Sequence, residues 1–121
     1  MYEQLLPVGS VVLLKGADKR VTIIGRILSM AGGDKIYDYG AVPYPEGLTD
    51  LDSLVFFDTD DIDLLYFVGF QDSEELQFRS EVLANLGELY VMPDGRIAQR
   101  TEDTAAEAEP KVEPDGEAHW A

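Results

Sequence analysis

Carboxylates are the most plentiful reactive groups in this sequence, and they are densest in one short stretch. Asp58, Asp60, Asp61 and Asp63 lie close together there. A calcium loop of the EF-hand type requires oxygen ligands at its positions 1, 3 and 5, glycine at 6 and glutamate at 12. A loop that began at Asp58 would have isoleucine at position 5, aspartate at 6 and glycine at 12. The stretch therefore predicts a solvated acidic turn that can also serve as a docking patch, and we expect no metal site.

The sequence contains few combinations of residues that could support catalysis. The chain has no cysteine and a single histidine, His119, which excludes disulfides and thiolate zinc sites and most Ser–His or Cys–His catalysis. Close pairs of carboxylates, which glycosidases use, arise by chance among 24 acidic residues in 121. Gly32 and Gly33 lack the Lys-Ser/Thr of a phosphate loop, and no Gly-x-Ser-x-Gly motif occurs. We therefore expect a protein that is not an enzyme, with no catalytic residue and no cofactor.

The charge of the chain narrows the classes of partner. Nine Lys and Arg residues stand against 24 Asp and Glu, a net charge of −15. This balance argues against binding to nucleic acid or to an anionic membrane surface, because both need cationic side chains. No apolar run approaches the roughly 20 residues of a membrane helix, and the acidic N-terminus does not fit a signal peptide. We expect a cytoplasmic protein whose partner is another protein.

Tyrosines are the best candidates for a contact surface. Tyr37 and Tyr39 share one face of an expected strand, and Tyr44 lies between Pro43 and Pro45. They can be half-buried core residues, or hot spots of a protein interface in which nearby carboxylates set the partner's charge. The expected partner-binding residues are Tyr37, Tyr39, Tyr44, Pro45, Glu46, Asp60, Asp61 and Asp63.

The elements that would carry these residues begin with strands. Residues 10–15, 20–29 and 35–42 each read as a strand, and short turns with glycine join them. Three strands linked in this way predict an antiparallel meander. Gly25 in the second strand predicts a bulge or a close approach of another backbone.

The second half of the chain mixes strands with one helix. Residues 54–57 predict a short strand, and residues 64–70 are apolar on both faces, which predicts a central strand or one covered by a helix. A helix is expected after Asp72, its N-cap, with Glu75 as capping-box partner. Its apolar stripe, which we expect in the core, consists of Phe78, Val82 and Leu86, with Leu83 beside them. Residues 89–92 and 96–98 predict a final hairpin around Pro93-Asp94-Gly95.

Together these elements predict an α+β fold: a small antiparallel sheet or partly open β-barrel with one packed C-terminal helix. Residues 1–100 would form this single domain. Residues 101–121 hold seven acidic residues against one lysine and few apolar ones, so we expect a disordered acidic tail.

The order of several short motifs resembles one family. They are LPVGSVVLLK at residues 6–15, IIGR at 23–26, YDY at 37–39, YPEG at 44–47, DID at 61–63 and FVGF at 67–70. The chain is similar over residues 1–78 to small acidic proteins of unassigned function from Gram-positive bacteria. The resemblance implies genes beside those of type VII secretion, WXG-type helical hairpin proteins and LXG-type toxins. It implies no catalytic residue, and it places Tyr39, Tyr44, Pro45 and Glu46 among motif residues near the surface.

Three functions remain open at this point. The first is an adaptor or chaperone that docks an LXG-type toxin, or a WXG-type export partner, before translocation. The second is an immunity protein that neutralises a toxin domain, for which negative charge would suit a basic nuclease. The third is an enzyme on a small molecule, which would need a concave pocket with perturbed carboxylates. We expect the adaptor.

Overall fold

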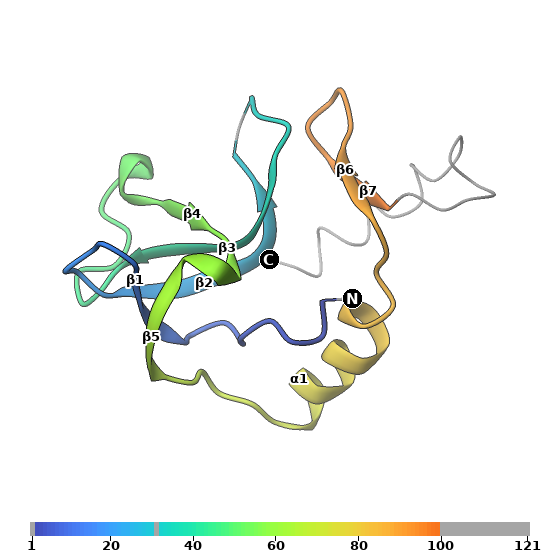
Figure 1. Ribbon diagram of the computed structural model, residues 1–121. Helices are drawn as coiled ribbons and strands as arrows, with labels where there is room; N and C mark the ends of the chain where they lie inside the picture. The colour runs from blue at the N-terminus through green and yellow to red at the C-terminus, as the bar shows by residue number, and fades with distance from the viewer. Residues whose placement is uncertain (1, 31, 100–121) are drawn as a thin grey trace.

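The computed structural model describes residues 2–30 and 32–99 of the chain. Five strands form one antiparallel sheet in the order β4-β3-β2-β1-β5, so β4 and β5 lie at its edges (Figure 1). The predicted α+β fold is confirmed, and the sheet is open rather than a closed barrel. The strands are β1 (Val11–Leu14), β2 (Val21–Ser29), β3 (Ile36–Pro43), β4 (Val55–Phe57) and β5 (Ile62–Phe67).

The long strand β2 is bent near its middle. Its pairing with β3 shifts register between Ile23 and Gly25, which confirms the predicted bulge. Ile27 follows with a φ of 59°, a left-handed conformation that β-branched residues rarely adopt. Gly40 lies opposite Gly25, and a side chain there would meet Leu28 Cδ1 at 2.5 Å. The far end of β2 curves away from the rest of the sheet together with the start of β3 (Figure 1).

One short helix follows the sheet. α1 (Ser73–Phe78) starts after Asp72, whose carboxylate accepts a hydrogen bond from the Glu75 amide at 3.0 Å, as predicted for the N-cap. The expected capping box is not formed, because the Glu75 carboxylate accepts hydrogen bonds from Arg26 and Arg79 instead. The helix continues as a π-helical turn, Arg79–Leu83. A separate hairpin of β6 (Leu89–Val91) and β7 (Ile97–Gln99) follows, which confirms the final hairpin predicted from the sequence.

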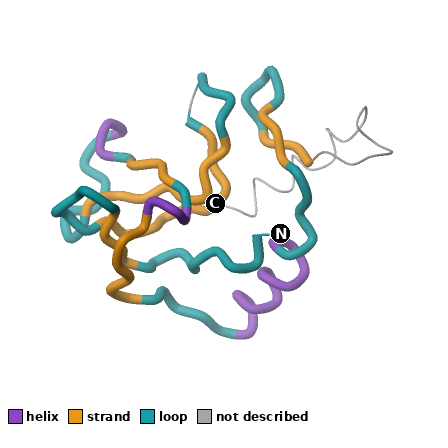
Figure 2. The backbone as a smooth tube through the Cα atoms, viewed as in Figure 1, coloured by secondary structure: helices purple, strands orange, loops and turns teal. Residues whose placement is uncertain are grey.

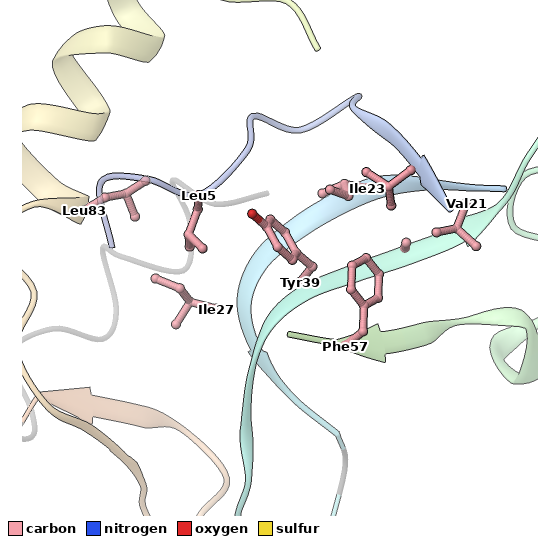
Figure 3. Close-up of a cluster of buried hydrophobic side chains, with 9 residues drawn as sticks. Leu5, Val21, Ile23, Ile27, Tyr39, Phe57 and Leu83 are labelled. Atoms are coloured by element: carbon pink, nitrogen blue, oxygen red, sulfur yellow. The ribbon is translucent and has the colours of Figure 1, made fainter. Parts of the chain in front are cut away.

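The core lies between one face of the sheet, the helix and the N-terminal segment. Residues before β1 form a loop that passes from the helix to the sheet (Figure 2). Tyr39 is 1% exposed, and its hydroxyl accepts a hydrogen bond from the Leu6 amide at 2.8 Å. From the helical segment Leu83 is fully buried, whereas Val82 of the predicted stripe is 37% exposed. The buried cluster (Figure 3) consists of Leu5, Val12, Val21, Ile23, Ile27, Tyr39, Ala41, Phe57 and Leu83.

The apolar stretch from residue 64 to 70 does not lie where the sequence predicts. The sequence predicts a central strand or a strand covered by a helix, but among residues 2–30 and 32–99 β5 pairs only with β1 and lies at the edge of the sheet. Its side chains from Leu64 to Phe67 are each about half exposed. The prediction was wrong because an apolar pattern does not encode the order of strands in a sheet.

Two further expectations concern the whole chain. No helix within residues 2–30 and 32–99 is long and apolar enough to span a membrane. The predicted disordered tail, residues 101–121, lies outside the described residues.

Candidate protein-binding surface

The largest group of exposed apolar side chains lies on β5 and in the loop that follows it. Residues Leu64 to Phe67 are 48% to 60% exposed, and Phe70 is 79% exposed. We call this group the β5 surface. Its members are Leu64, Leu65, Tyr66, Phe67, Val68 and Phe70. These side chains are exposed on both faces of the strand, and a cluster of exposed large apolar side chains marks a site where another molecule binds.

Strand β1 and the N-terminal segment hold β5 in place. The strands pair through Val12 opposite Leu65 and Leu13 opposite Leu64, with two irregularities of register along the ladder. Just after β5, Gly69 packs against the backbone of the N-terminal segment, where a side chain would collide with the Val8 carbonyl oxygen. The Gly69 amide also donates a hydrogen bond to the fully buried Ser10 hydroxyl at 2.9 Å. The exposed strand therefore has a fixed position.

Arg20 joins two exposed tyrosines beside this strand. Its guanidinium carbon lies 5.2 Å from the ring centroid of Tyr44 and 5.0 Å from that of Tyr66. The Tyr44 amide also donates a hydrogen bond to the Arg20 carbonyl oxygen at 2.9 Å. The sequence pointed to Tyr44 as a contact residue but not to Arg20 or Tyr66, because only the fold brings the residue before β2 next to the edge strand.

The predicted YPEG residues lie next to this cluster. Tyr44, Pro45 and Glu46 are exposed, and the Tyr44–Pro45 peptide bond is cis. Glu46 forms an ion pair with Lys19 at 2.8 Å, and the hydrogen bond from Lys19 lowers the pKa of this exposed carboxyl. These residues therefore flank the β5 surface as a solvated polar rim.

The acidic turn precedes β5 directly, and its carboxylates have two roles. Asp58 and Asp61 shape the turn, since the Asp58 amide donates a hydrogen bond to the Asp61 carboxylate at 2.9 Å. Asp58 also accepts hydrogen bonds from the Asp38 amide at 3.0 Å and from Lys35 at 3.1 Å. Within the described residues, the carboxylates of Asp60 and Asp63 accept no hydrogen bond and form no ion pair.

Two of the predicted contact residues lie away from the β5 surface. Tyr39 was expected near the surface, and this was wrong: it is a core residue, because its face of β3 packs against the N-terminal segment. Tyr37 is partly buried, with its ring 5.7 Å from that of Phe56. Strands β2 and β1 separate β3 from β5. The other six predicted residues flank β5 or lie at its start. They are Tyr44, Pro45, Glu46, Asp60, Asp61 and Asp63.

A second apolar region is a groove between the sheet, the helix and the final hairpin. It is an open cavity of about 1320 Å³. Its apolar lining includes Ile24, Leu28, Phe56, Phe70, Val82 and Leu86. Phe70 belongs to both this groove and the β5 surface, so the two apolar regions meet at the loop that follows β5.

Charged groups of the groove hold the helix to the sheet. Glu75 accepts two hydrogen bonds from the buried Arg26, at 2.9 and 3.1 Å, and one from Arg79 at 3.2 Å. Burial opposes ionisation of Glu75, but the hydrogen bonds and charges of the two arginines outweigh it and lower its pKa. A carboxyl with a lowered pKa stays ionised at neutral pH, so Glu75 acts as an ionic tie and is poorly suited to donate a proton.

Neither region gathers the ligands of a metal. Within the part of the chain that the structure describes, no group of three or more His, Cys, Asp or Glu side chains is placed to hold an ion. The arrangement of the β5 surface instead offers apolar area, two tyrosine rings and nearby carboxylates, which are the features of a contact surface for a polypeptide.

Comparison with protein families finds a match. Residues 5–78 match the family described as a domain of unknown function, DUF4176. This range runs from the N-terminal segment through the sheet to the end of α1, so it includes all of the β5 surface. Neither the curated proteins nor the solved structures contain a match to the chain.

Proposed function

The chain belongs to the DUF4176 family, whose domain is of unknown function, and we propose that this protein is a non-catalytic module that holds another polypeptide. The observation that carries the proposal is the β5 surface. Its six apolar side chains are held in fixed positions yet exposed to water, which favours their coverage by a partner. Tyr44 and Tyr66 with Arg20 between them add the residue types that are most frequent in contact hot spots.

The proposed partner is a type VII secreted toxin of the LXG type, or a WXG-type helical protein of the same export route, bound in the cytoplasm before export. Two arguments support this choice. The motif order of residues 1–78 resembles that of small acidic proteins, and this resemblance implies such genes as neighbours. The net charge of −15 also favours a partner with basic surface, because opposite charges increase the rate of association.

Co-expression with the LXG protein encoded nearest to this gene tests the proposal. We expect the two proteins to purify together, and Phe67→Lys to weaken the complex about tenfold or more, because a charge would be buried in the contact. Leu51→Lys is the matched control: Leu51 is 76% exposed but lies in the short turn before β4. Absence of a complex with any part of the toxin would contradict the adaptor function.

An immunity protein is the second candidate, and the strongly negative charge of the chain favours it too. The part of the toxin that is bound separates the two functions. An adaptor binds the N-terminal export region and changes secretion alone. An immunity protein binds the C-terminal toxic domain and restores growth of cells that produce that domain. Truncated toxins carrying one region each, tested for binding and for growth rescue, distinguish these outcomes.

A further inference from the structure

Strand β5 leaves one of its two edges without a neighbour. Within residues 2–30 and 32–99, only β1 pairs with it, whereas β2 and β3 are paired on both edges. Proteins protect exposed edges with charged residues, proline, bulges or very short strands. The opposite edge is protected by its length, since β4 has three residues. In contrast, β5 has six residues, Ile62–Phe67, without lysine or proline. Its protection is limited to one charge, Asp63, and to two bulges, because the ladder with β1 skips Asp63 and Tyr66.

An open, apolar edge is the template that an extended peptide needs. The backbone groups of the free edge give such a peptide its hydrogen bonds, and exposed side chains on both faces of the strand select its residues. On β5 both faces are available, because Leu64, Leu65, Tyr66 and Phe67 are each about half exposed. A helical partner would cover one face of the strand and leave its edge unpaired.

Charge decides which extended segment fits. The carboxylates of Asp60 and Asp63 lie at the start of β5, on either side of Asp61. A cation, Lys15, lies near them in the turn after β1, where its backbone amide donates a hydrogen bond to the Asp61 carbonyl oxygen at 2.9 Å. Arg20 is engaged by Tyr44 and Tyr66. A second copy of this chain would bring another net charge of −15 to the same edge, so self-pairing is electrostatically unfavourable.

We propose that β5 receives an extended segment of the partner as a sixth, antiparallel strand of the sheet. This inference rests on the proposed function, and it names the mode of binding and the chemistry of the bound segment. Opposite Leu64 to Phe67 the segment carries apolar side chains on both of its faces, because both faces of β5 expose apolar side chains. Lysine or arginine follows on its C-terminal side, because antiparallel pairing places that end beside Asp60 and Asp63.

Selection from a phage-displayed library of random short peptides tests this proposal without knowledge of the partner. Peptides are selected on the full-length protein and removed on the variant Leu64→Lys, whose added lysine makes the edge repel basic strands. We expect enrichment of short runs of consecutive apolar residues followed by Lys or Arg. We also expect binding to weaken about tenfold or more in Leu64→Lys and to remain unchanged in Leu51→Lys, the exposed control.

Hydrogen exchange on the unaltered protein gives a readout that does not depend on a variant. The best selected peptide should slow exchange of backbone amides within Ile62–Phe67, because only strand addition gives these amides new acceptors. Protection confined to other residues would overturn the proposal. So would selected peptides that are acidic, that show a helical spacing of apolar residues, or that bind Leu64→Lys equally well. Sedimentation showing a dimer that Leu64→Lys abolishes would assign the edge to a second copy instead.

These results separate the two proposals. If the co-expressed toxin binds without slowing exchange in Ile62–Phe67, strand addition is wrong while the protein-binding function stands. If peptides with an apolar run and a basic C-terminal end bind this strand but no toxin region does, the edge is a peptide site and the adaptor function is wrong.

Discussion

Strands β2 and β5 each contain five large apolar residues, but β2 lies inside the sheet and β5 at its edge. β2 pairs with β1 on one side and β3 on the other, and its Ile23 is fully buried. Within the part of the chain that the structure describes, β5 pairs with β1 alone, and its Leu65 is 48% exposed. The same kind of side chain therefore stabilises the core in one strand and stays available for contact in the other.

The two strands are also connected to the rest of the protein in different ways. β2 reaches the helix through the buried Arg26, which is bound to Glu75, so it links the two main parts of the fold. β5 is fixed mainly by backbone contacts at its end, around Ser10 and Gly69. β2 therefore determines stability, whereas the exposed side chains of β5 can be replaced with little effect on the fold.

Truncation of one apolar residue in each strand is the strongest test of this difference. Ile23→Ala should lower the free energy of unfolding by about 4 kcal/mol, because it leaves a cavity in a fully buried site. Leu65→Ala should lower it by about 1 kcal/mol or less, since half of that side chain is already in water. Urea unfolding followed by circular dichroism measures both values. Equal losses would show that β5 belongs to the core.

Replacing Glu75 removes the tie between β2 and the helix. Glu75→Gln should cost about 3 kcal/mol, because it leaves the buried Arg26 without its counter-charge. The folded-state pKa of Glu75 is lowered, so its contribution to stability is present above its ordinary value of 4.5 and is lost as the pH falls through the folded pKa.

The pH dependence provides a second readout for the same variant. The free energy of unfolding of the unaltered protein should fall from pH 4.5 downward more steeply than that of Glu75→Gln, which has no carboxyl to protonate at this position. Glu74→Gln is a suitable control, since Glu74 is exposed on the same turn. Parallel pH curves for the unaltered protein and Glu75→Gln would mean that the tie contributes nothing.

The sequence allowed most elements of the fold to be predicted, because their signals are local. Alternating apolar residues and turn glycines predicted the strands of the sheet, Gly25 predicted the bulge, and Asp72 predicted the start of the helix. The edge position of β5 could not be predicted, because it depends on pairing with β1, far away in the sequence. The burial of Tyr39 could not be predicted for the same reason, because the N-terminal segment that covers it is far away in the sequence.

The candidate surface could be predicted only in part. Tyr44, Pro45, Glu46 and the acidic turn were selected from residue type, and they flank β5. Arg20 and Tyr66 carry no signal of their own, because a single arginine and a single tyrosine are uninformative until the fold places them in contact. The pair Arg26 and Glu75 was missed for the same reason, since the two residues come from different elements.

Removing the Ser10 hydroxyl should loosen the end of β5 more than the centre of β2. Ser10 is fully buried, donates to the Pro7 carbonyl oxygen at 2.8 Å and accepts from the Gly69 amide at 2.9 Å. Ser10→Ala leaves that amide without its acceptor, which should cost about 2 kcal/mol. Hydrogen exchange should become faster at Gly69 than at Ile23, whose amide keeps its bond to the Ser10 carbonyl oxygen at 2.8 Å. Equal acceleration at both amides would contradict a role specific to β5.

Separating Arg20 from its two rings should have the smallest effect on stability. A cation over an exposed aromatic ring contributes about 0.5 to 1 kcal/mol, so Arg20→Gln should cost about 1 kcal/mol in total. A double-mutant cycle with Tyr66→Leu should return a coupling of about 0.5 kcal/mol between the two side chains. The control is Lys19→Gln, which breaks the exposed ion pair with Glu46 and should show no coupling to Tyr66→Leu. A coupling of zero between Arg20 and Tyr66 would mean that backbone pairing alone positions the exposed strand.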